Sequence, residues 1–276
     1  MITELAPAKI NLALHVRARR PDGYHEIETL FAFCRDGDVV TVNKAPEGSF
    51  MLTGPHAKAL AGQSDNLVAR AVAAFKATYS IRGSQQVTLD KHLPIASGIG
   101  GGSADAAATL RALAKMYGKP LDSHVLQMCA ASIGSDVPAC LLGRTAFGTG
   151  RGERLTPIDG LTGMPVLLVN PGVAVSTAEV FKAWDGVDRG QLGTGDPLSV
   201  AFAGRNDLQP AAITIAPTIA DVLSLLVAQS RVTLVRMSGS GATCFALFED
   251  ELARSAARRA IAAAQPDWWY LESTLA

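Results

Sequence analysis

Charged residues, aromatic residues and cysteines are all scarce in this chain of 276 residues. Charged side chains make up 18% of it, and 25 basic residues balance 25 acidic ones, so no net charge attracts nucleic acid or an anionic membrane. This balance still allows a local basic pocket. The cysteines form no CxxC pair and have no histidine at ligand spacing, which indicates reduced thiols in a cytoplasmic protein. They are Cys34, Cys129, Cys140 and Cys244.

Long hydrophobic runs are also missing, although the mean hydropathy is positive. The longest stretch without a charge, residues 160–178, contains prolines, an asparagine and glycines, so it does not read as a membrane span. Residues 1–9 have no basic segment followed by an apolar core, and we expect no signal peptide. With 48% hydrophobic residues the chain can bury a large core, which excludes a disordered or fibrous protein.

Hydrophobic periodicity predicts antiparallel β structure at the start of the chain. Ile10, Leu12 and Leu14 alternate with other residues, which predicts a half-buried strand with Lys9 and Asn11 on its polar face. Further strands are expected at residues 27–33, 38–42, 49–52, 87–89, 166–169, 234–235, 244–248 and 269–271. Helices are expected at residues 66–79, capped by Ser64 and Asp65, and at residues 103–117, 125–133, 178–184, 219–227 and 252–264. Residues 143–152 and 186–197 are expected to be irregular. We predict two domains, residues 1–155 and 156–276.

A glycine-rich segment between a predicted strand and a predicted helix is the strongest local motif. Glycines leave backbone N–H groups accessible, and a helix start adds orphan donors and a positive dipole end, so the segment can cradle a phosphate. The alternative is a tight turn that needs glycine only for its geometry. No Gly-Lys-Ser/Thr closes the segment, and Ser103 replaces the third glycine of the dinucleotide-binding pattern. A lysine from elsewhere or a metal must therefore serve the phosphates. The segment consists of Pro94, Ile95, Ala96, Ser97, Gly98, Ile99, Gly100, Gly101, Gly102, Ser103 and Ala104.

At three other places in the sequence, the residues allow two interpretations each. Asp136 precedes Val137-Pro138, a pattern typical of a helix start, where the aspartate is either a functional acid or a complement to the helix dipole. Tyr24 and His25 follow a turn and form either an aromatic platform with a donor or a capped turn. Residues 238–241, Ser-Gly-Ser-Gly, form a hairpin turn or a second anion-binding nest. No GxSxG, HExxH, EF-hand or Cys/His cluster is present.

In order along the chain, residues 7–12, 94–104 and 238–242 resemble the three motifs of the GHMP kinase superfamily. Residues 22–30 and 134–138 resemble the branch of that superfamily whose substrate is linked to cytidine diphosphate. The resemblance implies a two-domain α+β fold, with an N-terminal domain like domain 2 of ribosomal protein S5 and a C-terminal ferredoxin-like domain. It also implies a kinase of isoprenoid biosynthesis that uses ATP, with Mg²⁺, to phosphorylate the 2-hydroxyl of a methylerythritol moiety.

The resemblance implies a role for each matching residue. Residues 94–104 would hold the ATP phosphates, and Asp136 would accept the hydroxyl proton. Lys9 would pair with that carboxylate and polarise the hydroxyl. Asn66 and Lys91 would contact the adenosine.

On the substrate side, the resemblance implies that Tyr24 stacks on cytosine and that His25 hydrogen-bonds its edge. Phe181 would be the second platform for the base, and Asn11 would touch the substrate beside Lys9. Asp105 stands where some relatives have asparagine, and a carboxylate there would repel phosphate unless it meets Mg²⁺ or points away.

Two alternatives to this kinase remain for the chain. Homoserine or mevalonate kinase is the nearest within the superfamily, and Tyr24 with His25 argues against it. A non-catalytic nucleotide sensor is the alternative from another class, and the presence of both Lys9 and Asp136 argues against that. We expect ATP and a small cytidine diphosphate-linked molecule as partners, and neither nucleic acid nor a membrane.

Overall fold

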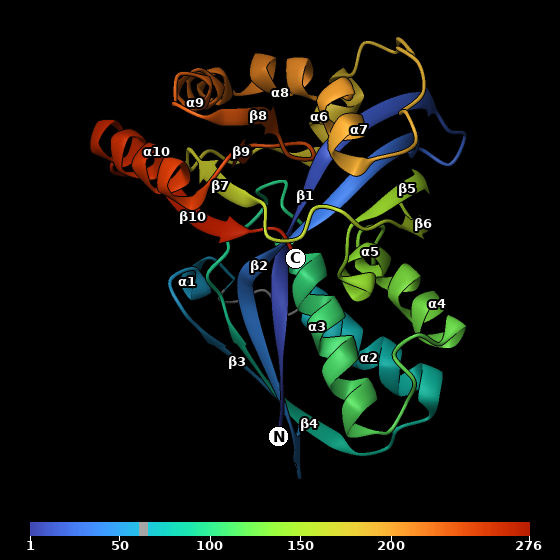
Figure 1. Cartoon of the computed structure of the whole chain (residues 1–276). Coiled ribbons are helices and arrows are strands. Elements are labelled where there is room, and N and C mark those ends of the chain that lie inside the picture. The colour runs from blue at the N-terminus through green and yellow to red at the C-terminus, as the bar shows by residue number, and fades with distance from the viewer. Residues whose placement is uncertain (61–65) are drawn as a thin grey trace. The chain divides into compact units, whose positions relative to one another are not determined.

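The computed structural model describes residues 1–60 and 66–276, which form two compact units that interleave along the sequence. Unit 1 comprises Met1–Ala8, Asp36–Ile95 and Gly100–Gly143, and unit 2 comprises Lys9–Arg35, Ala96–Ile99 and Arg144–Ala276. The long strands β1 (Ile2–Arg19) and β2 (His25–Ala45) contribute residues to both units (Figure 1). The division into domains 1–155 and 156–276 stays a prediction. No helix among the described residues is long and apolar enough to cross a membrane.

Unit 1 combines a small sheet with a group of helices. The second half of β2 pairs antiparallel with β4 (Ser84–Asp90), and β3 (Ser49–Thr53) pairs parallel with β4. Many alanines of α3 are buried, and their small side chains let α2 and α5 pack closely against this helix. Figure 1 shows α2, α3, α4 and α5 gathered together. The helices are α1 (Ala57–Leu60), α2 (Leu67–Tyr79), α3 (Gly101–Met116), α4 (His124–Ile133) and α5 (Val137–Leu142).

Unit 2 contains a four-stranded antiparallel sheet with the strand order β10-β7-β9-β8. Its core joins Val169 and Phe248 from this sheet to Val222 and Ile261 from the helices. The first half of β2 pairs with β5, which in turn pairs with β6. The strands are β5 (Ala146–Gly150), β6 (Arg154–Pro157), β7 (Pro165–Asn170), β8 (Val232–Met237), β9 (Cys244–Phe248) and β10 (Trp269–Thr274). The helices are α6 (Thr177–Ala183), α7 (Pro197–Ala203), α8 (Gln209–Ile215), α9 (Thr218–Val227) and α10 (Glu251–Ala264).

The predictions for the first two strands were partly wrong. Residues 27–33 and 38–42 belong to one strand, because the polar residues between them stay exposed on β2 and Gly37 lets β2 pass close to β1. A Cβ on Gly37 would lie 2.0 Å from the carbonyl oxygen of Ala6. The strand predicted to be half-buried is buried on both faces, and Lys9 and Asn11 are only 3% and 2% exposed. Polar side chains can be buried in this way when they have hydrogen-bond partners.

The helix predictions were right in kind but not at every boundary. Asn66 is the N-cap of α2, and its side-chain oxygen accepts the N–H of Ala69 at 2.9 Å. The predicted cap by Ser64 and Asp65 lies outside the described residues. Helix α3 begins at Gly101 rather than at Ser103, and residues 143–152, expected to be irregular, contain β5. The sequence analysis missed α7 and α8, because seven residues make about two turns and show little periodicity.

Candidate active site

The glycine-rich segment has the geometry of an anion-binding loop at a helix start. Gly98 and Gly100 have positive φ angles of 77° and 65°, and Gly100 is the N-cap of α3. No side chain accepts a capping hydrogen bond from the N–H groups in the first turn of this helix. A helix of 16 residues with such an N-terminus attracts an anion through these N–H groups and the helix dipole.

The Ser-Gly-Ser-Gly segment connects β8 to β9 and supports residues 96–99 of the loop within unit 2. The Ser238 hydroxyl donates to the carbonyl of Gly98 at 2.9 Å, and the N–H of Thr243 donates to the carbonyl of Ser97 at 3.1 Å. A Cβ on Gly98 would lie 2.4 Å from the carbonyl oxygen of Ser238, so this position requires glycine. The N–H groups of Ser238 and Gly241 bond to protein carbonyls, which favours the hairpin interpretation over a second anion nest.

Lys9 lies in a buried hydrogen-bond chain of unit 2. Its ammonium donates to Asn11 Oδ1 at 2.9 Å, and Asn11 Nδ2 donates to Thr29 Oγ1 at 2.8 Å. The ammonium also lies 5.2 Å from the ring centroid of Phe31. Lys9 is therefore not a solvated surface lysine. Asn11, predicted to touch the substrate, orients this ammonium without cancelling its charge, and the sequence analysis missed Thr29 as the residue that holds Asn11.

Asp136 is the N-cap residue of α5, as predicted for a helix start, and Pro138 occupies the first turn. Its side chain makes no capping hydrogen bond to this helix. The carboxylate is half-buried at the N-terminus of α5, so the structure is compatible with both interpretations, a functional acid and a complement to the helix dipole. Lys9 belongs to unit 2 and Asp136 to unit 1.

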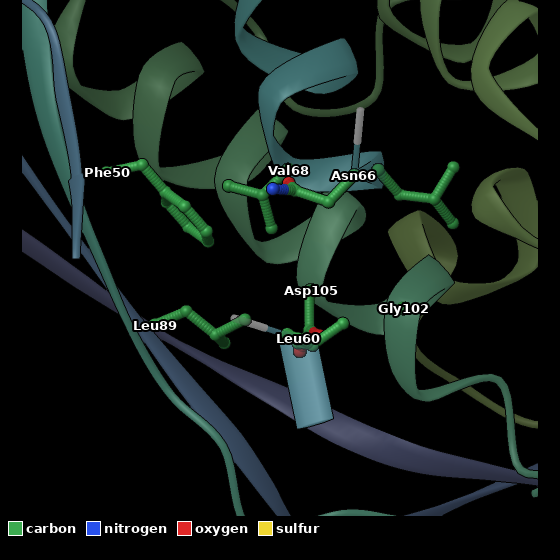
Figure 2. A pocket seen from close by; sticks show the side chains of 8 residues that line it. Phe50, Leu60, Asn66, Val68, Leu89, Gly102 and Asp105 are labelled. Atoms are coloured by element: carbon green, nitrogen blue, oxygen red, sulfur yellow. The ribbon is translucent and has the colours of Figure 1, made fainter. Parts of the chain in front are cut away.

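A pocket of about 180 Å³ in unit 1 lies beside the start of α3 (Figure 2). Asn66, from the N-cap of α2, and Gly102, from the glycine-rich loop, both line it. Most of the remaining lining is apolar, which suits a flat, hydrophobic ring with a few polar edges. The lining residues are Phe50, Leu60, Asn66, Leu67, Val68, Leu89, Gly102 and Asp105.

Lys91, for which a contact with adenosine was predicted, is a buried lysine with two acidic partners, and the contact with adenosine stays a prediction. Its side chain is only 2% exposed, and its ammonium donates to Asp38 Oδ2 at 2.5 Å and to Asp105 Oδ2 at 2.7 Å. The other oxygen of Asp38 accepts the N–H groups of His92 and Leu93 at 2.5 and 2.8 Å. This buried triad of Asp38, Lys91 and Asp105 ties the end of β4 to β2 and α3. The sequence analysis missed Asp38, because nothing in its local pattern marks it as more than a strand residue.

The charges of the triad explain how a carboxyl group is tolerated at residue 105. Burial, together with the neighbouring Asp38, raises the pKa of Asp105 to about 8, although Lys91 acts in the opposite direction. Burial alone would lower the pKa of Lys91, but the attraction of Asp105 and Asp38 outweighs it and raises that pKa. The raised pKa favours the uncharged form of Asp105 more than in an exposed carboxyl group, and its Oδ2 atom bonds to Lys91.

His25 and Phe181, both predicted to bind the base, lie together in unit 2, and Tyr24 precedes His25 in the chain. The rings of His25 and Phe181 lie 4.9 Å apart, and Trp184 packs edge-on to His25 at 5.8 Å. Burial, and then Arg19, lower the pKa of His25, so its ring is neutral at neutral pH. Its Nε2 atom is buried and has no hydrogen-bond partner among the described residues.

Tyr24 lies in a turn capped by Asp22, as the alternative interpretation expected, and about half of its side chain is exposed. Its side chain is 51% exposed, while its N–H is held by Asp22 Oδ1 at 3.1 Å. The guanidinium of Arg151 covers its ring at 4.6 Å from the centroid. The sequence analysis missed Arg151 and Trp184, because both come from segments distant in the chain and neither belongs to a motif.

Among the described residues, no group of three or more His, Cys, Asp or Glu side chains is arranged to hold a metal ion. A Mg²⁺ ion carried by a nucleotide would not need such a group, because it usually binds only one or two carboxylates besides phosphates and water.

Comparisons with known proteins agree with this geometry. The family models for the N-terminal and C-terminal domains of GHMP kinases match residues 66–144 and 192–267. The chain is 55% identical to a 4-diphosphocytidyl-2-C-methyl-D-erythritol kinase of Rhizorhabdus wittichii, over 99% of this chain and 94% of the relative. A second relative with the same name, from Erythrobacter litoralis, is 49% identical over 100% of both chains.

Solved structures show the same relationship. A crystal structure of 4-(cytidine 5'-diphospho)-2C-methyl-D-erythritol kinase superposes with a TM-score of 0.79 and 34% identity, covering 99% of both chains. A homoserine kinase from Cytophaga hutchinsonii has a TM-score of 0.74 at 16% identity, over 99% of this chain and 94% of its own, and shows the shared fold alone. The predicted α+β fold is confirmed. The chain belongs to the GHMP kinases and, within them, to the family of 4-diphosphocytidyl-2-C-methyl-D-erythritol kinases.

Proposed function

We propose that this chain transfers the γ-phosphoryl group of ATP to the 2-hydroxyl of 4-diphosphocytidyl-2-C-methyl-D-erythritol, in isoprenoid biosynthesis. The observation that carries the proposal is the aromatic cluster around His25, whose neutral ring has a buried nitrogen without a hydrogen-bond partner among residues 1–60 and 66–276. Homoserine and mevalonate have no base to occupy such a cluster. Because the four cysteines are free and buried, a reducing cytoplasm suits the protein.

The proposed base site reads cytosine through two kinds of contact. Tyr24 and Phe181 offer ring faces for stacking, which contributes about 1–3 kcal/mol per base but hardly distinguishes one base from another. The edge must therefore be read by hydrogen bonds. A neutral His25 has one donor and one acceptor nitrogen, which can hydrogen-bond to the ring nitrogen or the amino group of cytosine.

The proposed nucleotide site lies at the start of α3. Residues 94–104 would hold the phosphates, with the N–H groups of the first helical turn directed to them. The adenine would occupy the pocket of Figure 2, where Asn66 offers a polar edge among apolar side chains. Lys91 would act on this site indirectly and not by direct contact. Through its bonds to Asp38 and Asp105 it would hold the glycine-rich segment in place.

The transfer itself needs positioning and charge stabilisation more than covalent chemistry. Asp136 would accept the proton of the substrate hydroxyl, and the Lys9 ammonium, oriented by Asn11, would stabilise the developing charge on that oxygen. Mg²⁺, when bound with ATP, would neutralise charge on the phosphates. Asp105 is not proposed as its ligand, because its carboxyl group bonds to Lys91.

ADP release tests the proposal directly. We expect release when ATP is supplied with 4-diphosphocytidyl-2-C-methyl-D-erythritol, and none above background with homoserine or mevalonate. Release with one of the latter two would assign the chain another acceptor. If no acceptor caused release while ATP still bound, the chain would be a nucleotide sensor.

Replacing Gly102 with valine is expected to raise KM for ATP by about tenfold, which corresponds to roughly 1.4 kcal/mol. Gly102 is exposed, and its Cβ would lie 3.3 Å from Leu67 Cδ1, so a branched side chain would fill the pocket. Steady-state kinetics should show KM for the cytidylyl substrate within about twofold of the wild type. Gly101 is less suitable, because a Cβ there would lie 3.1 Å from Lys91 Nζ.

The matched control for this variant is Gly193→Val, since Gly193 has open space around it. It should leave both KM values unchanged. Equal rises for ATP and the cytidylyl substrate in Gly102→Val would indicate a folding defect and would contradict a nucleotide pocket at this place.

Tyr24→Ala and His25→Ala are expected to affect base selection differently. Loss of the Tyr24 ring should weaken the binding of cytidylyl and uridylyl analogues by similar factors, because stacking tolerates either base. Loss of His25 should instead narrow the difference in affinity between the two analogues, since uracil presents a carbonyl where cytosine presents an amino group. Competition binding with both analogues measures this. Full preference for cytosine in His25→Ala would show that the edge is read elsewhere.

A further inference from the structure

Arg151 is the unexplained cation beside the proposed base site. It lies in the turn after β5, in unit 2, with its guanidinium 4.6 Å from the ring centroid of Tyr24. Its backbone N–H donates to Glu153 Oε2 at 2.6 Å, and Arg20 together with Arg151 lowers the pKa of Asp22, but no ion pair within 4.0 Å joins the Arg151 guanidinium to a carboxylate in the part of the chain that the structure describes. The guanidinium therefore stacks on an exposed ring without a direct ion pair.

The other arginines near this place are already engaged. Arg17 pairs with Asp188 at 3.0 Å, and Arg20 pairs with Glu26 at 2.7 Å. Arg19 donates to the carbonyl oxygen of Trp184 at 2.7 Å and lies over its ring. Among these arginines of the described chain, Arg151 is thus the one whose guanidinium can bind an anion without breaking an ion pair or a hydrogen bond.

We propose that Arg151 is a positioning residue that binds the diphosphate of the cytidylyl substrate and uncovers the Tyr24 ring as it does so. The inference rests on the proposed function, which places a base at Tyr24. A base and a guanidinium cannot occupy the same face of this ring. A stacking contact between Arg and Tyr is weak at an exposed site, whereas the guanidinium fork matches a phosphate with two parallel hydrogen bonds.

The geometry of a nucleoside diphosphate supports this exchange. Its phosphates begin one sugar away from the base, so an arginine stacked on the base platform needs only a rotation of its long side chain to reach them. The same side chain then serves two states. It covers the apolar ring when no base is bound, and it neutralises the diphosphate when the substrate enters.

The test compares cytidine, CMP and CDP binding to the wild type, Arg151→Met and Arg151→Lys by calorimetry, together with kinetics on the full substrate. Methionine keeps a long apolar side chain and removes the charge and the fork. We expect Arg151→Met to weaken CDP binding by at least about tenfold, while cytidine binding stays within about threefold or becomes tighter. Arg151→Lys should lose less affinity for CDP than Arg151→Met does, because lysine keeps the positive charge. KM for the cytidylyl substrate should rise in Arg151→Met, whereas kcat and KM for ATP stay near the wild type.

Arg144→Met is the matched control. Arg144 is an exposed arginine of the same unit that pairs with Asp159 at 2.7 Å, and its loss should change none of these affinities. Equal weakening of cytidine and CDP in Arg151→Met would mean that Arg151 only supports the platform, and unchanged CDP binding would mean that it does not reach the phosphates. Either result overturns the inference. If the wild type bound no cytidine ligand at all, the proposed function would fail first, which separates the two failures.

Discussion

Asp136→Asn is expected to lower kcat by roughly 10²–10⁴-fold, the usual contribution of a positioned general base. Asparagine has nearly the same shape but cannot accept the proton of the substrate hydroxyl. Because asparagine is as good an N-cap residue as aspartate, α5 should keep its place and the variant should remain folded. Single-turnover kinetics at saturating substrate, with ATP affinity measured separately, should therefore show slow phosphoryl transfer with ATP binding nearly unchanged.

Asp196→Asn provides the control for this substitution. Asp196 is the N-cap of α7, and its carboxylate accepts the N–H of Ser199 at 2.8 Å. The same chemical change should there leave kcat near the wild-type value. Near-normal turnover of Asp136→Asn would remove Asp136 from the mechanism, and loss of ATP binding would indicate a disturbed nucleotide site instead.

Lys91→Met is expected to lower the free energy of unfolding by about 3–5 kcal/mol, the usual cost of removing one partner from a buried ion pair. The ammonium is the shared donor for Asp38 and Asp105, so its loss leaves two buried carboxyl groups facing each other. Methionine fills most of the space, which isolates the electrostatic part of the effect. Urea denaturation followed by far-UV circular dichroism measures the change.

Lys58→Met, at an exposed lysine of α1, is the comparison variant, and its stability should be within about 0.5 kcal/mol of the wild type. We also expect Lys91→Met to weaken ATP binding, because the triad anchors both ends of the glycine-rich loop. A stability loss below about 1 kcal/mol would contradict the importance of the buried pair.

Much of the candidate site is readable in local sequence. The glycines before α3 predicted a phosphate loop, since positive φ angles and accessible N–H groups depend mainly on residues close together in the chain. Proline after Asp136 predicted a helix start for the same local reason. The five motif blocks in order predicted the family, and the comparisons confirmed it.

Burial could not be predicted in this way. Alternation along β1 placed Lys9 and Asn11 on a polar face, yet both are buried. Asn11 accepts from Lys9 and is itself bonded to Thr29 and Ser238, which come from distant parts of the chain. Lys91 resembled a ligand contact, but Asp38 and Asp105 converge on it from distant positions. A sequence pattern describes the faces of its own segment and says nothing about the partners that cover them.

The sequence by itself determined the family, the α+β class, the phosphate loop and the acid at the start of α5, because these depend on neighbours within a few residues or on motifs kept in order. Only the tertiary structure decided that Lys91 bonds to Asp38 and Asp105, that burial raises the pKa of Asp105, and that Arg151 covers Tyr24. The physical reason is that the charge state and availability of a side chain depend on burial and on partners from elsewhere in the chain, which exist only after folding.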